Sequence, residues 1–326
     1  MSQSASLVAS PASPPTARRA GPSALGDKLF HAAATGSGVF VLVLLGAIIL
    51  SLLIGGLPAF RAFGFDFLIN ADWYPVQQVF GAAVPVYGTL ITSLLALAMA
   101  VPVAFGVAFY LTELAPLWFR RPVGTAIELL AAVPSIIYGM WGFFIIVPLM
   151  GSYGEPFVID LFDGVPVLGD LFQGPPFGTG ILTAALILAV MVLPFIAATM
   201  RDVFLTVPAV FKESAYGLGC TTWEVMRSIV IPYTRVSVVG GIMLGLGRAL
   251  GETMAVTFVI GNSDHITANL FGSGNTIASI VALEFPEAST GSLKLSALLA
   301  LGFILFVISF IVLAISRTLL RPRLKV

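Results

Sequence analysis

Residues 236–261 read VSVVGGIMLGLGRALGETMAVTFVIG, a run of 26 residues that is long and apolar enough to cross a membrane. Only two of these residues are charged, Arg248 and Glu252, and they stand four positions apart. A lone charge near the centre of a bilayer costs about 3 kcal/mol on insertion scales. The stretch therefore predicts a spanning helix in which a cation and an anion, one turn apart and in mid-span, offset part of each other's cost.

The composition of the whole chain favours a bilayer as its solvent. Of its 326 residues, 58% are hydrophobic and 10% are charged, whereas roughly 25% of residues are charged in a typical soluble domain. The net charge is zero, the single cysteine Cys220 excludes an intrachain disulfide, and two distant histidines make a weak case for metal chemistry. We therefore expect an all-α membrane protein with no catalytic residue, no cofactor, no metal site and no nucleic-acid partner.

Six stretches meet the length of about 20 apolar residues that a spanning helix needs. They cover residues 37–60, 86–111, 123–150, 180–200, 236–261 and 293–316. Pro134 interrupts the third stretch, which predicts a kinked or broken helix at that point.

The remaining segments complete the expected organisation. Residues 1–36 are rich in Ser, Ala and Pro and predict a disordered cytoplasmic tail. Residues 61–85 predict an extracytoplasmic loop, and residues 318–326 predict a short cytoplasmic tail. The core of the protein is then expected to cover residues 86–317, including a long cytoplasmic loop at 201–235.

The placement of basic residues predicts the orientation in the membrane. Thirteen of the sixteen Lys and Arg residues fall in the two chain ends and in the loops after the second and fourth spans. The opposite loops carry Arg61 and nine acidic residues. Because cytoplasmic loops are enriched in Lys and Arg, both termini are expected in the cytoplasm. No repeat of helix pairs is evident, which argues against a carrier built from inverted halves.

The loop at residues 201–235 reads RDVFLTVPAVFKESAYGLGCTTWEVMRSIVIPYTR and predicts two short helices. The first is entered through Pro208 and ends at Gly219, and the second begins near Thr221 or Thr222 and is stopped by Pro232 before the fifth span. Both helices mix apolar and charged residues. Composition alone leaves two interpretations open, a docking surface for another protein or a helix pair that lies on lipid headgroups.

The spacing within this loop resembles a motif of importer-type ABC permeases, E-A-A, three residues, G, nine residues, I, one residue, L-P. The matching residues in this chain are Glu213, Ser214, Ala215, Gly219, Ile229 and Pro232, with Ser214 in place of Ala and Ile231 in place of Leu. The resemblance implies an importer-type ABC permease fold in which the helix around Glu213 is a coupling helix that docks on a cytoplasmic ATPase. No G-x-x-x-x-G-K-[ST] sequence is present, so ATP hydrolysis is expected on a separate subunit.

Three further stretches, residues 87–114, 128–144 and 247–262, resemble the C-type permease subunits of phosphate-importing ABC transporters. The resemblance implies an assembly with a second, A-type permease subunit, two ATPase subunits and an extracytoplasmic phosphate-binding protein, embedded in membrane lipid. The expected function is the ATP-driven import of inorganic phosphate across the cytoplasmic membrane. A sulfate or molybdate permease is the nearest alternative, and a proton- or sodium-coupled carrier and a non-transporting scaffold or sensor subunit are further ones.

Within that function, Arg248 is the candidate contact for the translocated anion, because a guanidinium presents a planar fork of donors to phosphate oxygens. Glu252 is the candidate resting counter-charge. A buried ion pair that only fixes helix rotation or register remains the alternative. Glu128, placed near the cytoplasmic end of the third span, is expected to snorkel to the interface, pair with a permease partner or line the inner mouth, and a structural role is favoured.

Overall fold

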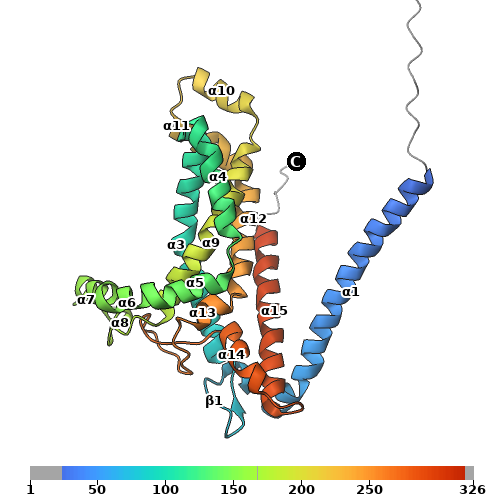
Figure 1. Ribbon diagram of the computed structural model, residues 1–326, viewed down its shortest axis with the longest axis vertical. Helices are drawn as coiled ribbons and strands as arrows, with labels where there is room; N and C mark the ends of the chain where they lie inside the picture. Colours follow the sequence, from blue (N-terminus) through green and yellow to red (C-terminus); the bar gives the residue numbers. More distant parts are fainter. Residues whose placement is uncertain (1–23, 167, 320–326) are drawn as a thin grey trace, which may run out of the picture. The chain divides into compact units, whose positions relative to one another are not determined.

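The computed structural model describes residues 24–166 and 168–319, and this part of the chain is mostly helical (Figure 1). Its helices are α1 (Ala24–Phe63), α2 (Asp66–Ile69), α3 (Ala83–Phe109), α4 (Leu117–Ala131), α5 (Ser135–Trp141), α6 (Val147–Leu149), α7 (Glu155–Phe162), α8 (Leu168–Leu171), α9 (Ile181–Leu205), α10 (Ala209–Gly217), α11 (Thr222–Val225), α12 (Ile231–Leu250), α13 (Met254–Thr257), α14 (Ile277–Glu284) and α15 (Leu293–Leu319). Four π-helical segments, η1 (Tyr110–Leu114), η2 (Gly142–Ile146), η3 (Met150–Gly154) and η4 (Met226–Val230), join neighbouring helices, and η5 (Phe285–Glu287) is a 3₁₀ turn. The strands β1 (Trp73–Tyr74) and β2 (Val79–Phe80) form one antiparallel hairpin.

Within the described residues, six helical stretches are long and apolar enough to span a membrane, which confirms the predicted number. They run through Gly26–Phe63, Ala83–Leu114, Ser135–Phe162, Ile181–Leu205, Thr222–Leu250 and Leu293–Ser316. Three of them differ from the expected ranges in a way that matters for the site.

The first difference concerns the N-terminal segment. The predicted disordered tail covers residues 1–36; residues 1–23 lie outside the described part, whereas residues from Ala24 onward are already helical. Asp27 stands in the first turn of α1, where the helix dipole favours a carboxylate, and an alanine run at residues 32–34 has high helix propensity. At the other end, α15 extends to Leu319, and the predicted tail lies outside the described residues from position 320.

The third span is displaced toward the C-terminus. The break at Pro134 is confirmed, because α4 ends at Ala131 and α5 begins at Ser135. However, the spanning stretch is Ser135–Phe162, and residues 117–131 form the separate helix α4. Hydropathy merged the two because the apolar residues of α4 run directly into those of α5. Glu128 therefore lies outside the third span, which corrects its expected position.

The fifth span begins earlier and ends earlier than predicted. Residues Thr222–Leu250 form one continuous helical stretch, and Pro232 does not end the helix as expected. The π-helical segment η4 explains this continuity, because the Ile231 N–H bonds to Met226 O and the proline follows at the start of α12, where the bonding pattern changes. The stretch ends at Leu250, with Gly251 as the C-cap, rather than at Gly261.

The chain divides into two compact units, residues 1–50 and residues 51–326. The described part of the first unit is the helical segment 24–50 of α1, whose residues 26–48 are all exposed. In the second unit, α3 and α9 pack along most of their length, and α4, α12 and α13 pack on α9. Residues Gly55 and Gly56 in the last turns of α1 lie against Leu299 and Ala300 of α15.

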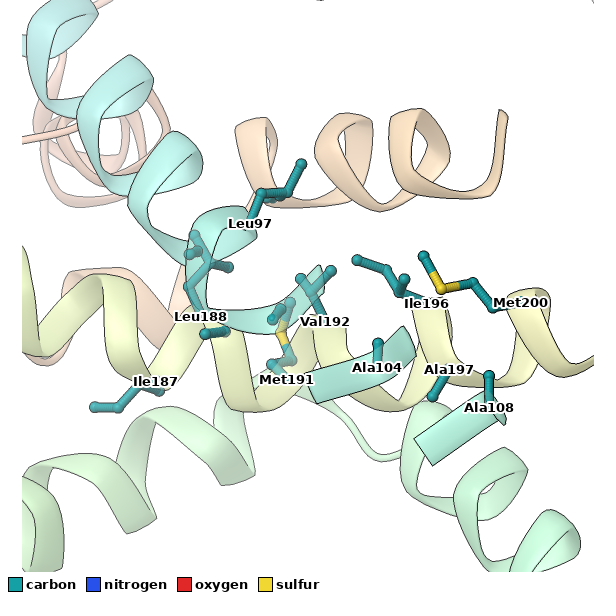
Figure 2. Packing of buried hydrophobic residues seen from close by; sticks show 14 of the residues in the cluster. Leu97, Ala104, Ala108, Ile187, Leu188, Met191, Val192, Ile196, Ala197 and Met200 are labelled. Carbon is teal, nitrogen blue, oxygen red and sulfur yellow. The ribbon is translucent and has the colours of Figure 1, made fainter. Parts of the chain in front are cut away.

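Small residues explain the close contact between α3 and α9. Ala96, Ala100, Ala104 and Ala108 recur every four positions along α3 and are fully buried. This spacing places them on one face of the helix, where they let a neighbouring backbone approach. Figure 2 shows Ala104 and Ala108 beside the larger apolar side chains of α9, including Met191, Ile196 and Met200. The core of the second unit therefore forms around these two helices.

Gly88, near the start of α3, is a second point of close packing. A Cβ at this position would overlap the backbone carbonyl oxygen of Asn275, which cannot move aside as a flexible side chain could. Two hydrogen bonds fix the side chain of Asn275. Its Nδ2 donates to Asp264 Oδ1 at 3.1 Å, and its Oδ1 accepts from Ser279 Oγ at 2.7 Å. The loop before α14 is thus fixed against the start of α3.

We predict that Gly88→Ala lowers the apparent melting temperature of the purified complex by about 5 °C or more, because overpacking against backbone costs a few kcal/mol. Gly106→Ala on the same helix is the matched control, because a Cβ there meets nothing within 4 Å. Thermal unfolding of the detergent-solubilised complex, followed by size-exclusion chromatography, measures both. Equal melting temperatures for the two variants would contradict the contact.

Candidate functional site

Arg248 lies in the last turn of α12, and its guanidinium stands over the ring of Phe195 on α9, 5.9 Å from the ring centroid. This distance is within the range of a cation–π interaction. Among the described residues Arg248 makes no ion pair, and the structure gives it no hydrogen bond to another described group. The guanidinium therefore keeps most of its hydrogen-bonding capacity free.

The expected ion pair between Arg248 and Glu252 is not formed, because the helix does not continue through both residues. Gly251 caps the end of α12, and Glu252 follows outside it. Glu252 Oε1 instead accepts from the backbone N–H of Ala255 at 3.3 Å, at the start of α13. A carboxylate at the N-terminus of a helix and a guanidinium at the C-terminus of another are each favoured by the helix dipole. Helix ends thus stabilise both charges, contrary to the mid-span placement predicted from the sequence.

The glycines of α12 define which of its faces meets α9. Gly241 and Gly245 are buried, and a Cβ at Gly245 would come within 2.8 Å of the Ile196 side chain. Arg248, three residues further, lies on this same side of the helix. A Cβ at Gly247 would meet nothing within 4 Å, and at Gly251 it would meet only the carbonyl oxygen of Gly247. Gly241 and Gly245 thus pack inside the described chain, whereas Gly247 and Gly251 leave an open face.

Helix α5 lies against α13. Its Tyr138 hydroxyl donates to Leu130 O at 3.0 Å across the break at Pro134. On the neighbouring turn, a Cβ at Gly139 would come within 2.9 Å of the Ala255 backbone, so α5 and α13 are in close contact. Arg248 and Glu252 therefore lie where the end of α12, the start of α13, α5 and α9 meet.

The predicted coupling segment is a helix followed by a glycine turn, which confirms the expected local structure. α10 covers Ala209–Gly217, and Gly219 adopts a positive φ of 86°, a conformation that glycine tolerates best. Thr221 then begins α11 in a capping box with Glu224. Glu213, Ser214 and Gly219 are exposed, and Ala215 is buried.

The two remaining motif residues lie at the base of the fifth span, with Ile229 half-buried and Pro232 exposed. In Figure 1, α10 lies at one end of the α3, α9 and α12 bundle, beyond the ends of these helices. The motif thus combines an exposed helix with the start of a spanning one.

Within the described residues, one ion pair joins α10 to the rest of the protein. Lys212 Nζ lies 2.6 Å from Glu113 Oε1 in η1, which continues α3. The two side chains are only 16% and 7% exposed, so water screens the pair weakly. The sequence does not reveal this pair, because its members stand 99 residues apart. The sequence feature that could have revealed it is Glu113, a carboxylate next to the basic loop that follows the second span.

A second ion pair accounts for Glu128. Its Oε1 lies 2.5 Å from Arg201 Nη2, and the same guanidinium nitrogen contacts Asp202 Oδ1 at 2.8 Å. Glu128 is 54% exposed, whereas Arg201 is 17% exposed. This contact supports the structural alternative among the roles predicted for Glu128, because it ties α4 to the end of α9.

Comparison with known proteins identifies one family. Residues 101–326 match the model of the binding-protein-dependent transport system inner membrane component family. The chain is 60% identical over 294 residues to the phosphate transport system permease protein PstC of Pasteurella multocida, covering 90% of this chain and 91% of that one. It is 55% identical over 297 residues to the protein of the same name from Mesorhizobium japonicum, covering 91% and 90%.

Solved structures agree on the fold. A bacterial ABC transporter that imports the acidic polysaccharide alginate contains a chain that superimposes with a TM-score of 0.60 at 17% identity. The match covers 92% of this chain and 98% of that one. The MetNI methionine ABC transporter matches with a TM-score of 0.51 at 17% identity, covering 76% and 99%. At these identities the likeness shows a shared fold alone.

Proposed function

The chain belongs to the family of binding-protein-dependent transport system inner membrane components, and on this basis we propose that it is the membrane-spanning permease of an ATP-driven importer of inorganic phosphate. Phosphate is proposed as the substrate because the chain is 60% identical to a phosphate transport permease over nearly its whole length. The chain is a multi-pass inner-membrane protein and no enzyme itself. Hydrolysis of ATP falls to a separate subunit, because the sequence contains no P-loop.

The proposed complex contains a second, A-type permease subunit, two cytoplasmic ATPase subunits and an extracytoplasmic phosphate-binding protein. The family supports the presence of a binding protein. The exposed helix α10 supports an ATPase that docks at this end of the bundle. The open Gly247 and Gly251 face of α12 supports a close approach by a helix of the second permease.

The proposed orientation places both chain ends and α10 in the cytoplasm, and the loop before α14 outside. The distribution of Lys and Arg in the sequence supports it. The segments 1–36 and 318–326 are then cytoplasmic, and residues 61–85, with the β1–β2 hairpin, are extracytoplasmic.

Arg248 is proposed as the contact for the translocated anion. Its guanidinium has no counter-ion among the described residues, and it lies where four helices meet. The fork of N–H donors suits the oxygens of phosphate. Glu252 is proposed to keep the affinity for the anion low enough for release, through its negative charge near the same junction rather than through direct pairing.

Docking of the ATPase on α10 is tested at Leu218, which is 86% exposed at the end of that helix. We predict that Leu218→Asp weakens co-purification of the ATPase subunit at least tenfold, because a charge would be buried in an apolar contact. Val76→Asp, at a position 97% exposed in the β1–β2 hairpin, is the control and should co-purify normally. Normal recovery of the ATPase with Leu218→Asp would count against docking at this helix end.

The choice of substrate is tested by competition. Uptake of labelled phosphate by cells that carry this complex should be reduced by unlabelled phosphate and arsenate, and left unchanged by sulfate or molybdate at the same concentration. Inhibition by sulfate or molybdate at concentrations equal to that of phosphate would assign the permease to another oxyanion.

A further inference from the structure

A cavity of about 340 Å³ opens between α4, the end of α9 and the junction of α3 with η1. Its walls include three arginines, Arg120, Arg121 and Arg201, together with Glu128 and the apolar side chains of Leu111 and Leu205. The volume falls within the range of small-ligand sites. The transport path proposed at Arg248 does not use these residues.

The positive charge of this cavity is only partly neutralised. Arg201 is paired with Glu128 and Asp202. Arg120 donates from Nε to the backbone oxygen of Ala115 at 2.7 Å, which orients its guanidinium without cancelling the charge. Within residues 24–166 and 168–319, neither Arg120 nor Arg121 forms an ion pair. Two guanidinium groups beside the cavity thus remain without an anion.

The position of these two arginines on α4 increases the positive potential. α4 starts at Leu117, so Arg120 and Arg121 lie in or just after its first turn, at the positive end of the helix dipole. The helix dipole favours carboxylates at this end of a helix, but α4 has no acidic residue in its first turn. The two cations therefore destabilise the start of α4, and a bound anion would offset that cost.

The local packing builds the floor of the cavity. Gly124, one turn after Arg120, is buried, and a Cβ there would overlap the Arg201 guanidinium. Arg201 therefore passes directly along α4 at Gly124 and reaches Glu128, one turn further on the same face of the helix. The absence of a side chain at Gly124 brings the third arginine to the same cavity as the other two.

We propose that this cavity binds a phosphate group, carried by the headgroup of an anionic phospholipid. With the orientation given under Proposed function, on which this inference rests, the cavity lies at the cytoplasmic surface of the membrane. Basic pockets between helices on this side are suited to anionic headgroups. Leu111 and Leu205 would face the glycerol and the first acyl carbons, while Arg120 and Arg121 bind the phosphate oxygens. Free inorganic phosphate has the same chemistry, and the experiment separates the two sources.

The test uses the purified complete complex in phosphatidylcholine nanodiscs, with Arg120→Gln/Arg121→Gln as the double variant. In one arm, short-chain phosphatidylglycerol is titrated and its binding is followed by native mass spectrometry. In the other arm, labelled inorganic phosphate is titrated without anionic lipid. Arg235→Gln is the matched control, because it removes one exposed cation from the same half of the protein outside this cavity.

We expect the double variant to bind phosphatidylglycerol about 25-fold more weakly than the wild type, at about fivefold for each arginine, and Arg235→Gln to bind normally. A loss confined to the phosphate arm would keep the phosphate-group site and assign it to the free ion. Equal binding of both probes by the double variant and the control, or no binding by the wild type, would overturn the proposal.

One further variant covers the case in which the double variant fails to fold. If the double variant does not assemble, Arg121→Gln alone is used, because Arg121 is exposed and makes no ion pair within the described residues; a fivefold loss is then expected. Neither arm measures uptake. Failure of this site therefore leaves the import function untouched, and failure of phosphate import would leave the binding result interpretable.

Discussion

Replacement of Arg248 by Gln is expected to reduce phosphate uptake at least 100-fold while the complex still assembles. The Arg248 guanidinium lies at the junction of α12, α13, α5 and α9 and stands over the Phe195 ring. It forms no ion pair among the described residues. A hydrogen bond to a charged group is worth about 1.5–3 kcal/mol, so loss of a two-pronged contact with the anion would exceed a factor of 100. Glutamine retains polarity and much of the length of the side chain without its charge.

Two control variants separate anion binding from structure. Arg248→Lys keeps the charge but loses the planar fork, and we expect intermediate uptake, about tenfold below the wild type. Phe195→Leu removes the aromatic ring and leaves the charge, so uptake should fall far less. Uptake in vesicles and size-exclusion chromatography of the complex measure the two properties. Normal uptake by Arg248→Gln, or its failure to assemble, would contradict the assignment of Arg248 to the anion.

Breaking the Lys212–Glu113 pair is expected to reduce uptake about tenfold or more, although the ATPase subunit still binds. Lys212→Met leaves the Glu113 carboxylate unpaired at 7% exposure, and removing one partner of a buried pair typically costs 3–5 kcal/mol. The pair is the ionic link between α10 and the α3–η1 helix. The unpaired carboxylate would then disturb the packing of α10 on the α3–η1 helix and displace the coupling helix from its working position.

The double variant Lys212→Met/Glu113→Gln tests the pair as a unit. It removes both charges and leaves no uncompensated carboxylate, so uptake should recover to within about threefold of the wild type. The cycle is completed by Glu113→Gln alone. Uptake and ATPase co-purification are measured for all four proteins. Independent, additive losses in the double variant would show that the two residues act separately.

The sequence predicted the number of spans and the local structure of the coupling segment, since both depend on local patterns. Hydropathy over windows of about 20 residues identifies stretches that are long and apolar enough to cross a bilayer. The helix around Glu213 and the turn at Gly219 follow from short-range backbone preferences, and the structure has both. Pro134 likewise marks a true helix break.

The details of the proposed site depend on contacts that local patterns do not contain. The end of α12 at Gly251 was not predictable, because glycine is frequent within membrane helices and the stretch contains several. The pairs Arg201–Glu128 and Lys212–Glu113 join residues 73 and 99 positions apart. The boundary between α4 and the third span was also not predictable, because burial by protein and burial by lipid select the same apolar residues.

The most direct measurement of the proposed function is phosphate uptake into proteoliposomes that contain this chain with its A-type permease and ATPase subunits. ATP is trapped in the lumen, and the phosphate-binding protein and labelled phosphate are added outside. We predict uptake that requires hydrolysable ATP and the binding protein, and that persists after proton and sodium gradients are collapsed by ionophores. Uptake driven by an ion gradient in the absence of ATP would contradict the assignment of this chain to an ATP-driven phosphate importer.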